Sequence, residues 1–276
     1  MPTTRLHFFI PCSLFLVLLF AHASAGAQDS FKLVRKIPVI AADFAIDGLE
    51  NIYLLTPGGQ LRKYGPAGDS IAVFNDVKRY GKVYGLDVSN PLRPLLFYKD
   101  FSTVLFLDRF LARKAALDLR RVEIAQASAV ANAYDNNIWV FDALQSKLKK
   151  LDESGRLLLE TPDFRQLFDF PFQPEKIVDG NSQVYLFDPK AGVLVFDYYG
   201  TFQKKYPATG WRSFQVVDRQ LVGVQDATLL FLNPGTYLQR QYQFPSSFGG
   251  FQRYQVSNSK LFALGKDSVA IYNAPF

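Results

Sequence analysis

Short runs in which apolar and polar residues alternate fill most of the chain, and residues 134–163 show this pattern most clearly. Within them, Ile138–Asp142 is β-branched and aromatic, and Lys147–Leu151 alternates with a period of two. Residues that accept a positive φ separate the runs, as at Asp135-Asn136-Asn137. Alternation broken by such turns is typical of antiparallel strands joined by tight hairpins. The expected strands of this four-stranded unit are residues 128–133, 138–142, 147–151 and 156–160.

The same unit recurs in looser form on both sides of this stretch. Asp47-Gly48 and Asp179-Gly180-Asn181 repeat the first turn, whereas Pro91 and Pro94 replace it in the second unit. Repeats of about 40 residues that carry four strands each have the period of propeller blades. The other units are expected to begin near residues 43, 83, 177, 214 and 254.

The last unit contains only three expected strands, at residues 254–256, 260–264 and 269–272. An additional alternating run, residues 31–39, precedes the first unit. If this run completes the last blade, the ring closes and no sheet edge is left at the seam. The sequence therefore predicts an all-β protein, a six-bladed β-propeller of four-stranded antiparallel blades whose N-terminal strand completes the last blade.

The repeated Asp-Gly or Asn turn, followed by a strand of β-branched, aromatic and aliphatic residues, resembles six-bladed β-propellers of the NHL and TolB-like kind. The strands ending in Leu186-Phe187-Asp188 and Val140-Phe141-Asp142 carry this resemblance, which covers residues 31–276. The second unit departs from it through its prolines and its basic residues 109–121. The chain also resembles exported propellers of Gram-negative cell envelopes. Because propellers serve many unrelated functions, the resemblance implies a fold and supplies no mechanism.

Residues 1–27 have a different pattern from the repeats. They contain one cation, Arg5, an apolar run over residues 8–20, and two small-x-small sites at Ala23-Ser24-Ala25 and Ala25-Gly26-Ala27. This arrangement is typical of a cleaved secretory signal. A proline and a serine interrupt the run, and the remainder is shorter than the ~20 residues that a spanning helix needs. We expect a signal peptide over residues 1–27, one propeller domain over residues 28–276, and export to the periplasm or the outer membrane.

Composition removes several classes of chemistry from the mature chain. The only cysteine (Cys12), the only methionine (Met1) and both histidines (His7 and His22) precede residue 28. Zinc sites built from Cys or His, haem sites with His or Met ligands, and Ser-His-Asp or Cys-His catalysis therefore lack their residues. A disulfide is excluded for the same reason. We expect no cofactor, no resident metal and no catalytic residue.

The net charge is +6, and removal of Arg5, the only charged side chain in residues 1–28, leaves +5. A basic balance can indicate a nucleic acid or an acidic membrane surface as partner. Here the cations are dispersed on strands, which favours solvation of outer faces, and export argues against nucleic acid. We read the densest basic segment, residues 109–121, as an outer strand with a cationic face. The alternative is an amphipathic element that makes peripheral membrane contact.

Oxygen-bearing side chains cluster at the repeated turns, as calcium ligands do. Their recurrence at the same hairpin favours turn formation over metal binding. These residues are Asp135, Asn136, Asn137, Asp179 and Asn181. Some propellers that hydrolyse lactones hold calcium in the channel through Glu, Asn and Asp. Asp43 and Glu175 stand at equivalent strand starts, without an Asn partner, and are either an acid and base pair or two solvated channel residues.

The connections between blades gather around one mouth of a propeller channel, and here they place aromatic residues beside arginines. Such combinations suit a protein-binding hot spot or a sugar-stacking platform. Phenylalanines such as Phe172 and Phe251 are read instead as filling the gaps between blades. The candidate binding residues are Arg79, Tyr80, Trp211, Arg212, Arg253 and Tyr254 on the loops, with Asp43 and Glu175 in the channel.

Together these patterns predict an exported, non-catalytic propeller that presents one loop-rich face to a protein partner in the cell envelope. We expect a monomeric propeller within a complex. One alternative is a propeller hydrolase or lyase that acts on a sugar or lactone through Asp43 and Glu175. Another is a carbohydrate-binding propeller that uses Trp211.

Overall fold

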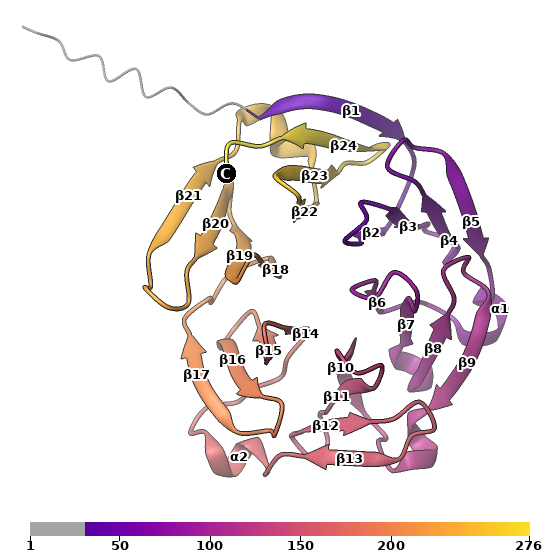
Figure 1. Cartoon of the computed structure of the whole chain (residues 1–276), viewed down its shortest axis with the longest axis vertical. Coiled ribbons are helices and arrows are strands. Elements are labelled where there is room, and N and C mark those ends of the chain that lie inside the picture. The colour runs from indigo at the N-terminus through magenta and orange to yellow at the C-terminus, as the bar shows by residue number, and fades with distance from the viewer. Residues whose placement is uncertain (1–30) are drawn as a thin grey trace, which may run out of the picture. The chain divides into compact units, whose positions relative to one another are not determined.

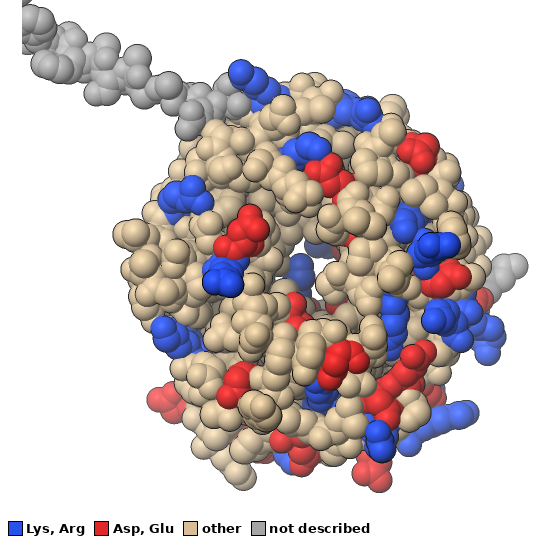
Figure 2. Space-filling view, in the orientation of Figure 1, with Lys and Arg blue, Asp and Glu red and all other residues tan. Residues whose placement is uncertain are grey.

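The computed structural model describes residues 31–276, so the predicted signal peptide lies outside the described residues. Six antiparallel sheets of four strands each form a ring (Figure 1), and the space-filling view shows a channel at its centre (Figure 2). Within each sheet the strands are hydrogen-bonded in chain order from the channel outward, except where the chain ends meet. The predicted six-bladed propeller is confirmed.

The first three blades follow one another along the chain without interruption. Blade 1 contains β2 (Asp43–Ile46), β3 (Ile52–Leu55), β4 (Leu61–Tyr64) and β5 (Ser70–Phe74). Blade 2 contains β6 (Gly85–Asp87), β7 (Leu95–Tyr98), β8 (Thr103–Leu107) and β9 (Arg113–Asp118). Blade 3 contains β10 (Ala127–Asn132), β11 (Ile138–Asp142), β12 (Lys147–Leu151) and β13 (Leu157–Glu160).

The next two blades repeat this order, and the last blade is assembled from both ends of the described chain. Blade 4 contains β14 (Lys176–Gly180), β15 (Gln183–Asp188), β16 (Gly192–Asp197) and β17 (Phe202–Tyr206). Blade 5 contains β18 (Ser213–Val217), β19 (Gln220–Gln225), β20 (Thr228–Leu232) and β21 (Gln239–Gln243). Blade 6 contains β22 (Arg253–Ser257), β23 (Lys260–Leu264), β24 (Ser268–Asn273) and, on its outer side, β1 (Lys32–Pro38).

β1 pairs antiparallel with β24, in a register that runs from Lys32 opposite Asn273 to Pro38 opposite Ser268. The prediction that the N-terminal strand completes the last blade is therefore confirmed. Aromatic rings add to this closure, because Phe31 packs against Phe248 with ring centroids 5.3 Å apart. At the other chain end Phe276 lies 4.8 Å from Phe231 of blade 5. Both chain ends thus join the packing between blades 5 and 6.

The hairpin turns owe their tightness to residues that adopt a positive φ. Asn136 has a φ of 63°, and Asp218 and Arg219 have φ values of 46° and 62°. Two successive positive φ values are the geometry of the type I′ turns that join two-residue hairpins. Local turn chemistry therefore sets the spacing of the first two strands in these blades.

Helical segments are short and lie in the connections. They are α1 (Val77–Tyr80), η1 (Lys99–Phe101), η2 (Leu119–Val122), α2 (Phe164–Leu167) and η3 (Ser246–Gly250). The basic segment at residues 109–121 comprises a turn, the outer strand β9 and the start of η2, so the prediction of an outer strand holds for Arg113 and Lys114 and not for Arg109, Arg120 and Arg121. Among residues 31–276, no helix has the length and apolar character needed to cross a bilayer.

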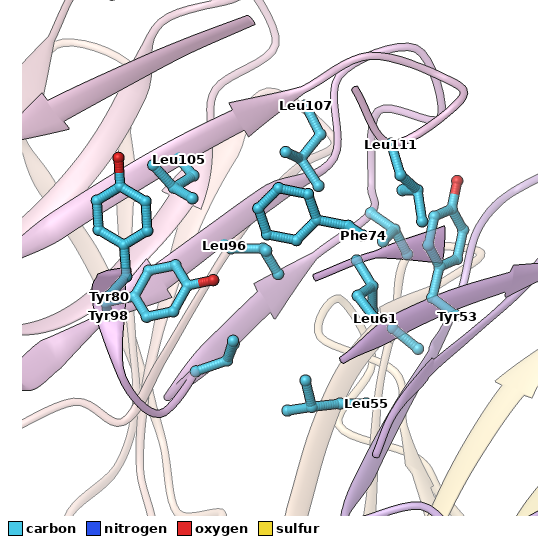
Figure 3. Packing of buried hydrophobic residues seen from close by; sticks show 13 residues of the cluster. Tyr53, Leu55, Leu61, Phe74, Tyr80, Leu96, Tyr98, Leu105, Leu107 and Leu111 are labelled. Carbon is cyan, nitrogen blue, oxygen red and sulfur yellow. The ribbon is translucent and has the colours of Figure 1, made fainter. Parts of the chain in front are cut away.

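The core is divided into separate apolar clusters, most of which fill the wedge between two neighbouring blades. Figure 3 shows the cluster between blades 1 and 2, where Leu61 and Phe74 of one blade lie beside Leu96 and Leu107 of the other. Flat sheets with two apolar faces can bury both faces only against neighbours, which explains the buried runs in the central strands. Each blade therefore buries its two apolar faces against the blades on either side of it.

Side-chain amides link the inner strands of adjacent blades next to the channel. Gln255 Oε1 accepts a hydrogen bond from Ile46 N at 2.9 Å, and its Nε2 donates to Ile46 O at 3.1 Å. Gln215 makes the same pair with Val256, at 2.9 and 3.4 Å. Both glutamines occupy the third position of their strands. These bonds satisfy backbone N–H and C=O groups on the channel-facing edges of the innermost strands, where no further strand is available to pair with them.

Candidate functional site

The antiparallel strand order places the connections of the propeller on two opposite faces. We call the loop face the one that carries the links between blades and the turns between second and third strands. The turn face carries the turns between first and second and between third and fourth strands. The predicted binding residues all belong to the loop face or to the loop-face end of the channel. Figure 2 shows the channel open at the centre of the ring, with charged side chains of both signs inside it.

On the loop face, the arginines of the predicted binding surface are exposed, whereas its aromatic residues are buried. Arg79, Arg212 and Arg253 are exposed. The prediction that Trp211 is exposed is wrong, because the side chain is 5% exposed. Its ring fills the space left by Gly223 in β19, where an added Cβ would lie 1.9 Å from Trp211 Cε3.

The two tyrosines of the predicted surface are also buried. Tyr254 stacks on Phe244 with ring centroids 4.4 Å apart, and its hydroxyl donates to Phe248 O at 3.1 Å. Tyr80 packs against Tyr98, 5.3 Å away, in the cluster between blades 1 and 2 (Figure 3). The exposed position expected for Tyr254 is therefore wrong, and Tyr80 belongs to the core. These rings fill wedges between blades, which was the reading given only to the phenylalanines.

The two candidate carboxylates differ in their surroundings. Asp43, the first residue of β2, forms an ion pair with Arg253, with 3.2 Å between Asp43 Oδ1 and Arg253 Nε. Two of the predicted binding residues, from blades 1 and 6, are therefore in contact. Glu175 is exposed and lies one residue before β14. Among residues 31–276, no hydrogen bond or ion pair joins Glu175 to Asp43. The structure therefore shows an Asp-Arg pair in place of the paired carboxylates that acid and base work requires.

Lys176, which the sequence reading passed over, is the first residue of β14 in blade 4. Its side chain is exposed to solvent, but the protein that surrounds it disfavours the charged form and lowers its pKa. Asp87 and Asp43 act to raise the pKa, and Arg253 acts to lower it further. Asp43 belongs to blade 1, directly across the ring from blade 4, so this coupling acts through the channel. The channel thus holds a mixed set of two cations and two carboxylates contributed by four blades.

The carboxylates at the repeated turns are occupied by contacts within the chain. Asp179 accepts from Tyr198 Oη at 2.6 Å and from Trp139 Nε1 at 2.8 Å. Asp135 accepts from Lys150 Nζ at 2.7 Å. Within the described part of the chain, no group of three or more His, Cys, Asp or Glu residues is arranged to hold a metal ion.

Lys150 is the centre of an aromatic box on the turn face, between blades 3 and 4. Its ammonium lies 4.7 Å from the ring centroid of Tyr134, 5.0 Å from that of Trp139 and 5.8 Å from that of Tyr198. Tyr134 and Tyr198 stack at 4.3 Å with planes 11° apart. Boxes of this kind bind cations through the negative faces of the rings. Here the chain's own lysine fills the box and joins the two blades.

Large apolar side chains are exposed at the tips of the turn-face hairpins. Turn tips are ordinarily polar, so several exposed apolar groups on one face indicate an interaction surface. Tyr199 is 86% exposed and Leu238 is 71% exposed, both on turns between third and fourth strands. The other members of this set, the turn-face apolar residues, are Leu49, Leu92, Phe110, Tyr134 and Tyr237. The loop face exposes a smaller set, which includes Ile40, Phe101, Leu144 and Leu167.

The turn face also contains a buried cation, Arg93, in the turn between β6 and β7. Its guanidinium carbon lies 4.1 Å from the ring centroid of Phe106. Its Nε and Nη2 are the only buried side-chain nitrogen or oxygen atoms of residues 31–276 without a hydrogen-bond partner. Sequence reasoning missed Arg93 because a turn between two prolines carries no signal that the side chain between them is buried.

The chain is similar in fold to several solved propellers. A virginiamycin B lyase from Staphylococcus aureus matches 88% of this chain and 99% of its own, with a TM-score of 0.62 and 10% identity. The WD40 domain of Neurospora crassa Pan2 matches 89% of this chain and 96% of its own, with a TM-score of 0.61 and 10% identity. A streptogramin B lyase matches 83% of this chain and 78% of its own, with a TM-score of 0.58 and 12% identity.

At these identities the similarity shows the propeller fold alone. No family model matches the sequence, and no curated protein matches it. The narrower resemblance to NHL and TolB-like propellers, and to exported propellers of Gram-negative envelopes, stays a prediction.

Proposed function

We propose that this protein is an exported, non-catalytic propeller that binds a protein partner in the cell envelope. The signal pattern of residues 1–27 supports export, and the basic but dispersed charge suits a protein partner better than nucleic acid. The propeller holds its binding face rigid, since every blade is buried between two others. Such preorganisation reduces the entropy lost on binding.

The observation that carries this proposal is the set of turn-face apolar residues. Tyrosine is among the residues that dominate the energetics of protein interfaces, and leucine adds apolar area that is buried when a partner covers it. Here Tyr199 and Leu238 stand on hairpins of neighbouring blades and are fixed by the sheets beneath them. We therefore move the proposed binding surface from the loop face, where Trp211 and Tyr254 are buried, to the turn face.

A lyase function is the second candidate, because lyases are among the solved structures of similar fold. One of these structures is a catalytically inactive variant of virginiamycin B lyase in which a histidine is replaced by alanine. Both histidines of the present chain precede residue 28, so residues 31–276 have none to play that part. In the channel, Asp43 is held by Arg253. These observations favour the binding function.

The test is capture of partners from native envelopes by tagged mature protein after mild crosslinking. We compare wild type with a turn-face variant, Leu92→Ser with Tyr199→Ser and Leu238→Ser. A loop-face variant, Arg79→Ser with Arg212→Ser, is the matched control. We expect one specific partner with wild type and with the loop-face variant, and at least a tenfold loss with the turn-face variant, as for removal of hot-spot residues.

Equal capture by all three proteins would contradict the placement on the turn face. Loss only with the loop-face variant would return the surface to the predicted arginines. If no specific partner is captured and purified protein turns over a lactone or a streptogramin substrate, the non-catalytic proposal fails.

A further inference from the structure

Arg93 is an anomaly, because a charged group is buried with part of its hydrogen-bonding capacity unused. The residue is 7% exposed, and only Nη1 has a partner, Asn132 Oδ1 at 3.2 Å. Burial lowers the pKa of Arg93, whereas Glu153 and Asp87 act to raise it. A guanidinium nevertheless stays charged at neutral pH. Burying a charge with open donors is costly, so an acceptor for Nε and Nη2 is to be expected.

Residues that lie near Arg93 leave these two donors unfilled. The carboxylate of Asp87 already accepts from Asn132 N at 2.7 Å and from Ser89 N at 2.8 Å. Glu153 Oε2 lies 3.8 Å from Nη2, which is too long for a hydrogen bond, and the Glu153 side chain is 48% exposed. Glu153 therefore stands over Arg93 as a loosely held counter-ion from blade 3.

The positions of Nε and Nη2 indicate which kind of acceptor would fit Arg93. Nε and Nη2 form one edge of the guanidinium, and two parallel N–H groups on that edge match the two oxygens of a carboxylate. A phosphate would carry more negative charge into a place already faced by Glu153 and Asp87. A single carboxylate is the better match.

The surface around Arg93 indicates where that carboxylate comes from. Leu92, 65% exposed, precedes Arg93 on the turn of blade 2, and this turn lies beside the first turn of blade 3. Asn90 Nδ2 donates to Asn136 Oδ1 at 3.2 Å and ties these two turns together. An exposed apolar side chain beside a buried cation suits a peptide that presents a carboxylate next to an apolar side chain.

We propose that Arg93 is a carboxylate-binding site on the turn face and that an acidic side chain or C-terminal carboxylate of a protein partner occupies it by displacing Glu153. The identity of the occupant rests on the proposed function, whereas the site itself does not. Nε and Nη2 then donate to the incoming carboxylate, and Glu153 moves into water. Leu92 contacts the neighbouring apolar group.

The test uses the Arg93 Nε–Hε resonance of the mature protein in NMR titrations with sodium acetate, with sodium chloride at equal ionic strength as the control. Glu153→Gln removes the competing carboxylate. Arg109→Lys changes another arginine of the turn face, one that lies over the ring of Phe110, and serves as the matched control. We expect a saturable shift with acetate in wild type and Arg109→Lys, and about fivefold tighter binding in Glu153→Gln, the effect of losing one weak ion pair.

Three outcomes would overturn the site. One is an equal response to chloride and acetate, which would indicate a nonspecific charge effect. Another is the absence of a saturable shift in both wild type and Glu153→Gln. The third is binding in Glu153→Gln alone, which would make Glu153 the permanent occupant. Because acetate requires no partner, these outcomes are independent of the capture experiment, and failure of that experiment would leave the carboxylate site in place.

Discussion

Trp211 and Gly223 form the contact that removes the most conspicuous aromatic residue of the loop face from the surface. An added methyl group at Gly223 would lie 1.9 Å from the Trp211 ring, well inside contact distance. Gly223 sits in the middle of β19, a strand with buried residues on both faces. Glycine is required at this position for the close approach of the indole ring.

Gly223→Ala should therefore lower the free energy of unfolding by about 3 kcal/mol, because overpacking forces the ring or the strand to move. Urea unfolding followed by tryptophan fluorescence measures the change. Gly249→Ala, where nothing lies within 4 Å of the added atom, is the control and should change stability by less than about 0.5 kcal/mol. If the two variants are equally stable, Trp211 does not occupy the space above Gly223.

At the scale of elements, the junction between blades 3 and 4 contains two carboxylates whose pKa values move in opposite directions. Burial raises the pKa of Asp179, although hydrogen bonds from Tyr198 and Trp139 oppose this. Burial also acts to raise the pKa of Asp135, but hydrogen bonds from Lys150 and Asn137 outweigh it and hold the pKa below its usual range. The two groups therefore make opposite contributions to the dependence of stability on pH.

The pKa of Asp135 is lower in the folded than in the unfolded protein, so its stabilising contribution is present above the unfolded pKa of about 4 and is lost as the pH falls through the folded value. Asp135→Asn should cost about 1 kcal/mol at pH 6, a modest value because the pair is partly exposed, and much less near pH 3. Urea unfolding across this range measures the difference. In a Lys150→Gln background the same substitution should show little dependence on pH; a dependence as large as in the wild-type background would exclude Lys150 as the cause.

The strands and turns could be predicted from the sequence, whereas the burial of particular side chains could not. Turns such as Asn136 and Asp218-Arg219 depend on local chemistry, so their positions and the strands around them could be predicted. The burial of Trp211 depends on Gly223, which is distant in the repeat, and that of Arg93 depends on Phe106 and Asn132. No short-range pattern carries these contacts. The exposure predicted for Arg79, Arg212 and Arg253 agrees with the structure, and that predicted for Trp211 and Tyr254 is wrong. The binding role of these residues stays a prediction.

At the scale of the whole molecule, closure of the ring depends on β1, which comes from the N-terminal end of the described chain and completes blade 6. Without residues 31–38, β24 would be an unpaired edge strand, and Phe31 would be missing from the packing against Phe248. An open edge favours pairing with other chains. We expect a chain that lacks residues 31–38 to unfold at a lower temperature and to self-associate as concentration rises.

A synthetic peptide of residues 31–38 should restore the melting temperature of that shortened chain in a saturable manner, since the β24 edge remains available to it. A peptide of the same composition in scrambled order is the control. Calorimetry measures the melting temperature, and sedimentation measures association. Equal stability of the full and shortened chains would show that the closing strand does not hold the ring together.

The pairing of β1 with β24 has a further consequence for the order of events during synthesis. β1 leaves the ribosome before any other strand of the propeller, and its only partner leaves last. Blades 1 to 5 are contiguous segments that can assemble as the chain emerges into the compartment where it folds. β1 must wait unpaired throughout, and its three cations, Lys32, Arg35 and Lys36, discourage premature pairing with the wrong edge. The emergence of β24, rather than the strength of any one contact, therefore times the closure of the ring.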